Sequence, residues 1–236
     1  MTLSILGYKL NFKSTKIVIS ILFIITAIVF INFPEIDLKV SSLFYNTESG
    51  FYLKNRPFAQ FIYYATFYVV YLFALVSIFL LILDFILRKN LFGIRKKVLT
   101  YLLISLILGP GLLVNLGFKE HWGRARPATT TYFGGDKQFT PAFIKTNQCQ
   151  HNCSFTSGHA AAAFYFLTLV PIVRSKKLKT AVILSALSWG SLVGFVRIIQ
   201  GRHFLSDVVF SAFFVVFTAW LSYYLIFKSD QEGESK

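Results

Sequence analysis

Charged residues and cysteines are scarce in this sequence. Only 14% of its 236 residues are charged, and only ten residues are Asp or Glu. The sequence contains two cysteines. A soluble domain built with so few charges would have little surface to offer to water, so this class is excluded. The sequence also contains no internal repeat, heptad array, Walker loop, low-complexity tract or soluble second domain.

Apolar residues dominate what remains. They make up 55% of the chain, and the mean hydropathy is +0.61. A bilayer core of about 30 Å requires roughly 20 apolar residues per helix. Six windows approach or reach that length: Ile17–Phe33, Phe58–Leu83, Val98–Phe118, His159–Val173, Thr180–Val196 and Phe204–Phe227. The fourth is short. The sequence therefore predicts an all-α integral membrane protein with six transmembrane helices.

Basic residues indicate how these helices are oriented. Lys and Arg concentrate before the first window, at 88–97, at 174–179 and in the tail, and together these segments hold most of them. Because Lys and Arg accumulate on the cytoplasmic side, both termini are expected to face the cytoplasm. The net charge of +14 fits topology signals and anionic head groups better than nucleic-acid binding. The first window lacks a cleavage site and is interpreted as a span.

The whole chain, residues 1–236, is predicted to be a single membrane-embedded domain. The tail from 228 to 236 is expected to lack regular structure, because it is rich in Asp, Glu and Ser.

Three short polar blocks interrupt the apolar pattern. They are Lys119-x6-Arg126-Pro127, Ser157-Gly158-His159 and Arg197-x5-His203-x3-Asp207. With six spans and a cytoplasmic N-terminus, all three fall on the periplasmic side. Ionisable groups at the ends of membrane helices require a partner, a ligand or water. The blocks therefore predict one shared periplasmic active site.

The third block contains a candidate nucleophile. Asp207 lies four residues after His203, and on a helix this spacing places the two on one face. The carboxylate would accept a hydrogen bond from one imidazole nitrogen and leave the other free to attack phosphorus. Arg197, across Gly201, offers forked donors that suit phosphate oxygens.

The other two blocks supply acid–base and anion-binding groups. Ser157 and Gly158 begin a helix, whose first turn can hold an anion with backbone N–H groups. His159 is placed to protonate a leaving oxygen and then to activate water. Lys119 and Arg126, with Arg197, could neutralise the charge of the transition state, so no metal and no cofactor are expected.

Each block alone has a simpler explanation. The His–Asp pair could be structural, Ser-Gly-His could be a helix cap, and Lys or Arg beside a span is usually a topology anchor. The blocks favour catalysis together, because they agree in side, charge and spacing.

In combination, the blocks resemble the signature of the type-2 phosphatidic acid phosphatase superfamily, over residues 119–207. The resemblance implies that His203 forms a phosphohistidine, that Asp207 orients it, and that His159 is the general acid and base. It implies phosphate binding by Lys119, Arg126, Ser157, Gly158 and Arg197. Thr156 and Val196 stand where the family commonly has Pro and Ser, which puts affinity or substrate choice in question.

Flanking stretches are similar to Gram-negative lipid A phosphatases, and favour the 4′-phosphatase over the 1-phosphatase branch. They are Phe33-Pro34-Glu35-Ile36-Asp37, Leu43-Phe44-Tyr45, Gly109-Pro110-Gly111, His121-Trp122-Gly123-Arg124 and Cys153-Ser154-Phe155. The resemblance thus implies a multi-pass protein of the bacterial inner membrane that removes a phosphate monoester from lipid A. Alternatives are an undecaprenyl diphosphate or phosphatidylglycerophosphate phosphatase, a lipid phosphotransferase, and, from another class, a phosphate-binding transporter.

Features outside the signature carry further expectations. Cys149 and Cys153 favour a small disulfide over free thiols, and a zinc site formed with His151 and His159 is least favoured because it lacks a standard spacing. Residues 36–44 have helical spacing that suggests a short helix on the membrane, with a packed loop as the alternative. Tyr63, Tyr64, Tyr68 and Tyr71 fit an interfacial aromatic belt. The sequence does not decide the oligomeric state.

Overall fold

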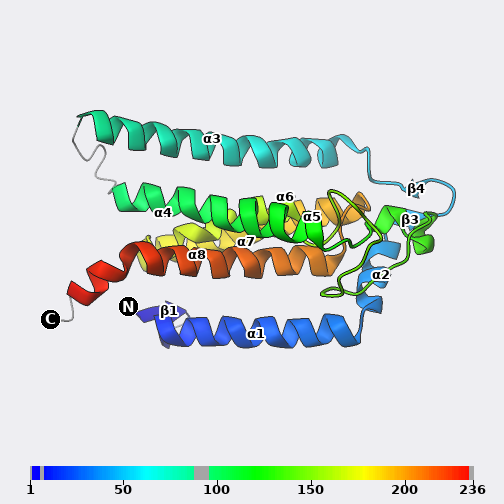
Figure 1. The fold of residues 1–236 in the computed structure, drawn as a ribbon, viewed down its shortest axis with the longest axis horizontal. Coiled ribbons are helices and arrows are strands. Elements are labelled where there is room, and N and C mark those ends of the chain that lie inside the picture. Colours follow the sequence, from blue (N-terminus) through cyan, green and yellow to red (C-terminus); the bar gives the residue numbers. More distant parts are fainter. Residues whose placement is uncertain (1, 6–7, 88–95, 234–236) are drawn as a thin grey trace.

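The structure is a computed structural model that describes residues 2–5, 8–87 and 96–233. Long helices run side by side along the longest axis (Figure 1). One end of the bundle carries α2, the β3–β4 hairpin and residues 122–157, and is called the loop end here. The elements are β1 (Thr2–Ile5), β2 (Tyr8–Asn11), α1 (Phe12–Asn32), α2 (Glu35–Ser42), β3 (Tyr45–Asn46), β4 (Gly50–Phe51), α3 (Pro57–Leu87), α4 (Lys96–Leu106), η2 (Ile107–Phe118), α5 (Lys119–His121), η3 (Pro127–Thr129), η4 (Thr131–Phe133), α6 (Gly158–Phe164), η5 (Tyr165–Leu169), α7 (Lys176–Ile199) and α8 (Leu205–Gly233).

The predominantly helical membrane architecture is as predicted. Among the described residues, five helical segments are long and apolar enough to cross a membrane: Ser14–Asn32, Pro57–Leu87, Lys96–His121, Lys176–Ile199 and Leu205–Lys228. They coincide with five of the six predicted windows. The strands form two short antiparallel hairpins, β1 with β2 and β3 with β4, and build no core.

The fourth window forms a shorter helix than expected. Its apolar helix covers Gly158–Leu169, with α6 followed by the 3₁₀ segment η5. Every residue of α6 is buried, including the run Ala160–Ala163. Small side chains let neighbouring helices approach closely: a Cβ on Gly190 of α7 would lie 2.1 Å from Phe164 Cδ1. The segment is therefore the enclosed centre of the bundle.

The third span is locally widened. Gly109-Pro110-Gly111 lies in η2, a π-helix, because Pro110 has no N–H to donate and glycine favours the helix weakly. The Asn115 amide donates a 2.7 Å hydrogen bond to the Pro110 carbonyl. The helix is thus locally loosened at this position. Asn115 faces the start of α6, where a Cβ on Gly158 would lie 2.5 Å from its Oδ1.

Two local expectations concern the ends of the bundle. Residues 36–44 contain the predicted short helix, α2, whose Asp37 and Ser41 are buried. At the other end α8 continues to Gly233. The tail expected to lack regular structure is therefore helical up to Gly233, and residues 234–236 lie outside the described residues.

Candidate active site

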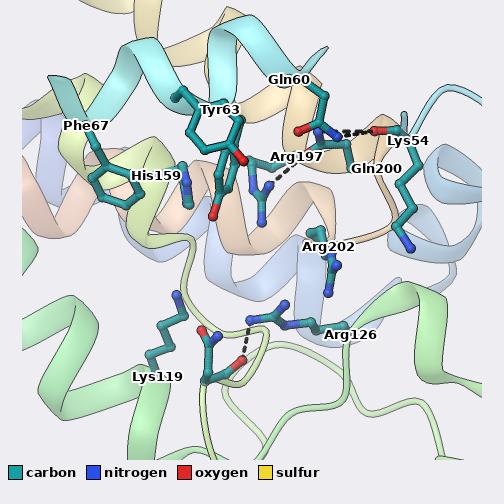
Figure 2. Close-up of a pocket in the computed structure, with 12 residues that line it drawn as sticks. Lys54, Gln60, Tyr63, Phe67, Lys119, Arg126, His159, Arg197, Gln200 and Arg202 are labelled. Atoms are coloured by element: carbon teal, nitrogen blue, oxygen red, sulfur yellow. Dashed lines mark hydrogen bonds between the residues drawn. The ribbon is translucent and has the colours of Figure 1, made fainter. Parts of the chain in front are cut away.

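A cavity of about 490 Å³ lies at the loop end, between α3, α5 and the start of α6. Figure 2 shows side chains converging on it from opposite sides, with Lys119 and Arg126 facing His159 and Arg197. These four belong to the predicted site and come from all three sequence blocks. The lining residues are Lys54, Gln60, Tyr63, Tyr64, Phe67, Lys119, Arg126, Asn152, His159, Arg197, Gln200 and Arg202.

His203 lies in the turn between α7 and α8 and is 1% exposed. Its Nδ1 is 2.8 Å from the backbone oxygen of Ser154. Because a carbonyl only accepts hydrogen bonds, Nδ1 carries the proton and Nε2 keeps its lone pair. No described residue bonds to Nε2. Burial lowers the pKa of His203 to about 3, and the charges of Arg197 and Lys119 also lower it. The imidazole is therefore neutral at neutral pH.

Asp207 does not accept the direct hydrogen bond from His203 that the sequence predicted. The two closest atoms, His203 Nδ1 and Asp207 Oδ2, are 3.7 Å apart. Because α8 begins at Leu205, His203 is outside the helix and the four-residue spacing does not place the pair on one face. Oδ2 instead accepts hydrogen bonds from the Ser154 hydroxyl at 2.6 Å and the Phe204 N–H at 2.7 Å. Ser154 thus links Asp207 to His203.

A fully buried arginine holds Asp207 from the other side. Arg124 donates to Asp207 Oδ1 at 2.6 Å and to Asp37 Oδ2 of α2 at 2.8 Å. Ser206 joins the same network, since its backbone N–H donates to Asp37 Oδ1 at 2.9 Å. Burial alone would lower the pKa of Arg124, but Asp207 and Asp37 raise it. The guanidinium is therefore charged and connects α2 to the region behind His203.

His159 lies against aromatic rings on α3. Its ring stacks on Tyr63 with centroids 4.5 Å apart and lies 4.3 Å from the Phe67 ring. Neither ring nitrogen bonds to a described residue. A buried polar atom without a partner requires an explanation, and the cavity that His159 lines offers a place for a ligand beside this ring. Tyr63 thus differs from the predicted aromatic belt, whereas Tyr64, Tyr68 and Tyr71 are exposed as expected.

Three cations of the predicted site are held in different ways. Arg197 donates to Gln200 Oε1 and lies under the Tyr63 ring, 4.9 Å from its centroid. Arg126 donates to the Asn152 carbonyl. Lys119 lies at the start of α5 and reaches into the cavity (Figure 2). An anion in the cavity would therefore meet three positive charges.

Ser157 and Gly158 are buried where α6 begins. The Ser157 hydroxyl accepts from the Ala160 N–H at 3.4 Å, so it caps the helix, and the Ser157 N–H donates to the Asp207 carbonyl at 3.2 Å. The need for glycine at 158 arises from Asn115, which leaves no room for a Cβ. The start of α6 is thereby fixed against both η2 and α8.

Cys149 and Cys153 form a disulfide. The small loop they close contains Asn152, whose carbonyl holds Arg126, and whose N–H donates to Glu120 Oε1 at 3.2 Å. The disulfide therefore stabilises a segment that lines the cavity.

The two departures from the family pattern lie outside the cavity lining. Val196 is fully buried among Ala59 and Ile62 of α3, and Thr156 is fully buried just before α6. Neither side chain lines the cavity.

Several residues of the site carry no role in the sequence-based prediction. Asp37 and Arg124 fall in the flanking stretches that carry the resemblance, and otherwise stand out as charges in an apolar chain. Lys54 and Tyr63 come from segments that meet the signature only in three dimensions, whereas Gln200 and Arg202 are unassigned positions within the third block.

Comparison with known proteins gives consistent relatives. A sequence model described as the PAP2 superfamily matches residues 97–231. A lipid A 4′-phosphatase of Francisella tularensis subsp. novicida is 35% identical over 207 residues, which cover 86% of this chain and 92% of that protein. A lipid A 4′-phosphatase of Rhizobium leguminosarum is 34% identical, covering 84% and 87%. One of Rhizobium etli is 38% identical, covering 56% and 48%. No solved structure matches significantly.

Proposed function

We propose that this chain, which belongs to the PAP2 superfamily, hydrolyses the 4′-phosphate monoester of lipid A. One observation carries the proposal: Lys119, Arg126, His159 and Arg197 line a single cavity. His203 does not line this cavity but is buried near it, where the charges of two lining residues, Arg197 and Lys119, act on its imidazole. The 4′ position is supported by the three relatives named above, each of which is called a lipid A 4′-phosphatase.

His203 is the proposed nucleophile. Its Nε2 lone pair attacks phosphorus in line, while the Ser154 carbonyl keeps Nδ1 protonated and takes up part of the positive charge that develops on the ring. Asp207 stabilises that charge across 3.7 Å. The phosphate oxygens are bound by Lys119, Arg126 and Arg197, which balance the charge that metal ions balance in kinases.

His159 is the proposed general acid and base. As an imidazolium beside the bound phosphate, it donates a proton to the sugar oxygen when the P–O bond breaks, so the lipid leaves as an alcohol and the imidazole becomes neutral. It then accepts a proton from a water molecule whose oxygen attacks the phosphohistidine, and the N–P bond breaks to release phosphate. The start of α6, where Ser157 and Gly158 are buried without lining the cavity, holds His159 in place.

We infer that the chain crosses the inner membrane six times, with the site on the periplasmic side and both termini in the cytoplasm. The site lies where α7 ends and α6 begins. The helix α7 has 24 residues and is long enough to cross the membrane. Because α7 starts at Lys176 at the opposite end, the segment from the start of α6 to Lys176 must cross the membrane in the other direction. The Cys149–Cys153 disulfide favours an oxidising compartment for the loop end.

Basic residues support the same orientation. Arg174, Lys176, Lys177 and Lys179 lie at the end opposite the site, as do Lys96 and Lys97. The rest of the basic cluster predicted at 88–97, residues 88–95, lies outside the described residues. At the loop end, five of the basic residues line the cavity. Their presence on that side is explained by anion binding, so it does not argue against a periplasmic location.

The purified protein is expected to release phosphate from lipid A with kcat/KM at least tenfold higher than from undecaprenyl diphosphate or phosphatidylglycerophosphate. Mass spectrometry of the product should show the loss of one phosphate, at the 4′ position. Higher activity on either of the other lipids would contradict the substrate. Transfer of label to a second lipid, instead of release as free phosphate, would indicate a phosphotransferase.

Replacing Tyr63 with Ala should lower kcat for phosphate release by about tenfold to a hundredfold. The ring packs against both His159 and Arg197, and a small displacement of catalytic groups is costly. Tyr63→Phe keeps the ring and should retain activity within about threefold. Equal losses in both variants would show that the hydroxyl, and not the ring, is what matters.

A further inference from the structure

The cavity contains more positive charge than one phosphate monoester requires. Five basic residues line it: Lys54, Lys119, Arg126, Arg197 and Arg202. No acidic residue of the described chain lines it. Three of the five suffice for the reacting phosphate in the proposed function, so Lys54 and Arg202 are left without a role.

These two side chains also lack polar partners in the part of the chain that the structure describes. Within residues 2–5, 8–87 and 96–233, the Lys54 ammonium and the Arg202 guanidinium make no side-chain hydrogen bond or ion pair. Arg126 and Arg197, in contrast, donate to Asn152 and Gln200. Burial lowers the pKa of Arg126, and repulsion by Arg202 adds to it. Tyr63 and Asp207 oppose this lowering of the Arg126 pKa, and an anion bound between Arg126 and Arg202 would relieve their repulsion further.

The backbone around both cations is well anchored. The Lys54 carbonyl accepts from Gln60 Nε2 at 3.4 Å and from Gln200 Nε2 at 3.5 Å. The Arg202 N–H donates to the Arg197 carbonyl at 3.0 Å. Gln200 therefore links Arg197 to the segment around Lys54. These bonds hold the backbone of Lys54 and Arg202 in place relative to the phosphate-binding residues.

Lys54 and Arg202 lie at the end of the cavity away from His159 and Phe67 (Figure 2). A volume of about 490 Å³ is typical of sites for whole organic ligands, and exceeds what a phosphate group occupies. Lys54 is exposed and Arg202 is half-buried, so both can be reached from the rim.

We propose that Lys54 and Arg202 form a second anion-binding subsite, which binds a further acidic group on the same lipid head group while its phosphate monoester lies beside His203. This inference rests on the proposed function and extends it: the preferred substrate carries two acidic groups. In lipid A the second group is a phosphate on the other sugar or a carboxylate of an attached acidic sugar.

The test compares kcat/KM on three lipids that share the 4′-phosphate. One also carries the 1-phosphate, one lacks any second acid, and one has an acidic sugar in place of the 1-phosphate. The wild-type protein should prefer the first or the third over the second by at least tenfold, as expected for charge-assisted contacts of this kind. Which of the two is preferred identifies the second acid.

The Lys54→Ala/Arg202→Ala variant should lose at least tenfold on the preferred two-acid lipid and less than threefold on the single-acid lipid. The charge-conserving Lys54→Arg/Arg202→Lys variant should restore most of the preference. Lys145→Ala removes an exposed charge elsewhere in the loop region and serves as the matched control, with an unchanged preference. If the double variant does not fold, Lys54→Gln alone should reduce the preference at least threefold.

Three results would overturn the subsite: no preference in the wild-type protein, equal losses on both kinds of lipid, or no loss on either. A wild-type protein that releases phosphate from none of the three lipids would overturn the proposed function as well. The two failures are therefore distinguishable.

Discussion

Replacing His203 with Ala is expected to lower phosphate release from lipid A by at least about a thousandfold. The imidazole supplies the only proposed covalent nucleophile, and loss of a nucleophile removes a step that the remaining groups do not replace. Among the described residues the Nε2 of His203 has no hydrogen-bond partner, so within that part of the chain the change breaks one side-chain hydrogen bond, from Nδ1 to the Ser154 carbonyl. Folding should therefore be retained, and inorganic phosphate should still inhibit binding of the lipid.

A matched control is available in His121. This residue is exposed on α5, outside the cavity lining, and its Nδ1 bonds to the Leu116 carbonyl. His121→Ala should retain activity within about twofold. Release of phosphate by His203→Ala at a rate close to that of His121→Ala would rule out His203 as the nucleophile.

Replacing Arg124 with Gln should both destabilise the protein and reduce its activity. Arg124, Asp37 and Asp207 are 0% exposed, and the arginine is bonded to both carboxylates. Removing one partner from a buried ion pair costs about 3–5 kcal/mol, because the other charge is left buried and unpaired. We expect the midpoint of thermal unfolding in detergent to fall by roughly 10 °C, together with kcat.

A double variant separates charge from packing. Asp37→Asn combined with Arg124→Gln removes one carboxylate together with the guanidinium, so it should be less destabilised than the sum of the single variants. Lys145→Ala, an exposed single-charge change, should leave the unfolding midpoint within about 1 °C. An Arg124→Gln protein that unfolds at the wild-type temperature would contradict a structural role for the network.

The long elements could be predicted from the sequence because they depend on local composition. Five apolar windows are long enough to identify membrane helices without knowledge of packing. The fourth segment was harder, because α6 is enclosed by its neighbours and needs little length or hydrophobicity of its own. Its Ala160–Ala163 run is a packing feature, whose meaning depends on which helices surround it.

The site was predictable to the extent that its residues share one signature. The cations and His159 converge on one cavity as the spacing implied. The hydrogen bond of His203 was not predictable, because it depends on the Ser154 backbone and on where α8 begins. The Asp37–Arg124–Asp207 network joins segments far apart in the sequence, so no local pattern could reveal it.

The most direct test follows the phosphate during turnover. The protein is mixed with lipid A carrying a radiolabelled 4′-phosphate, quenched in alkali and digested, and the labelled peptide is mapped. We predict an acid-labile label on the peptide that contains His203, released by water in a chase and absent from His203→Ala. Free phosphate appearing from lipid A without any label on this peptide, or with label on another residue, would contradict the account.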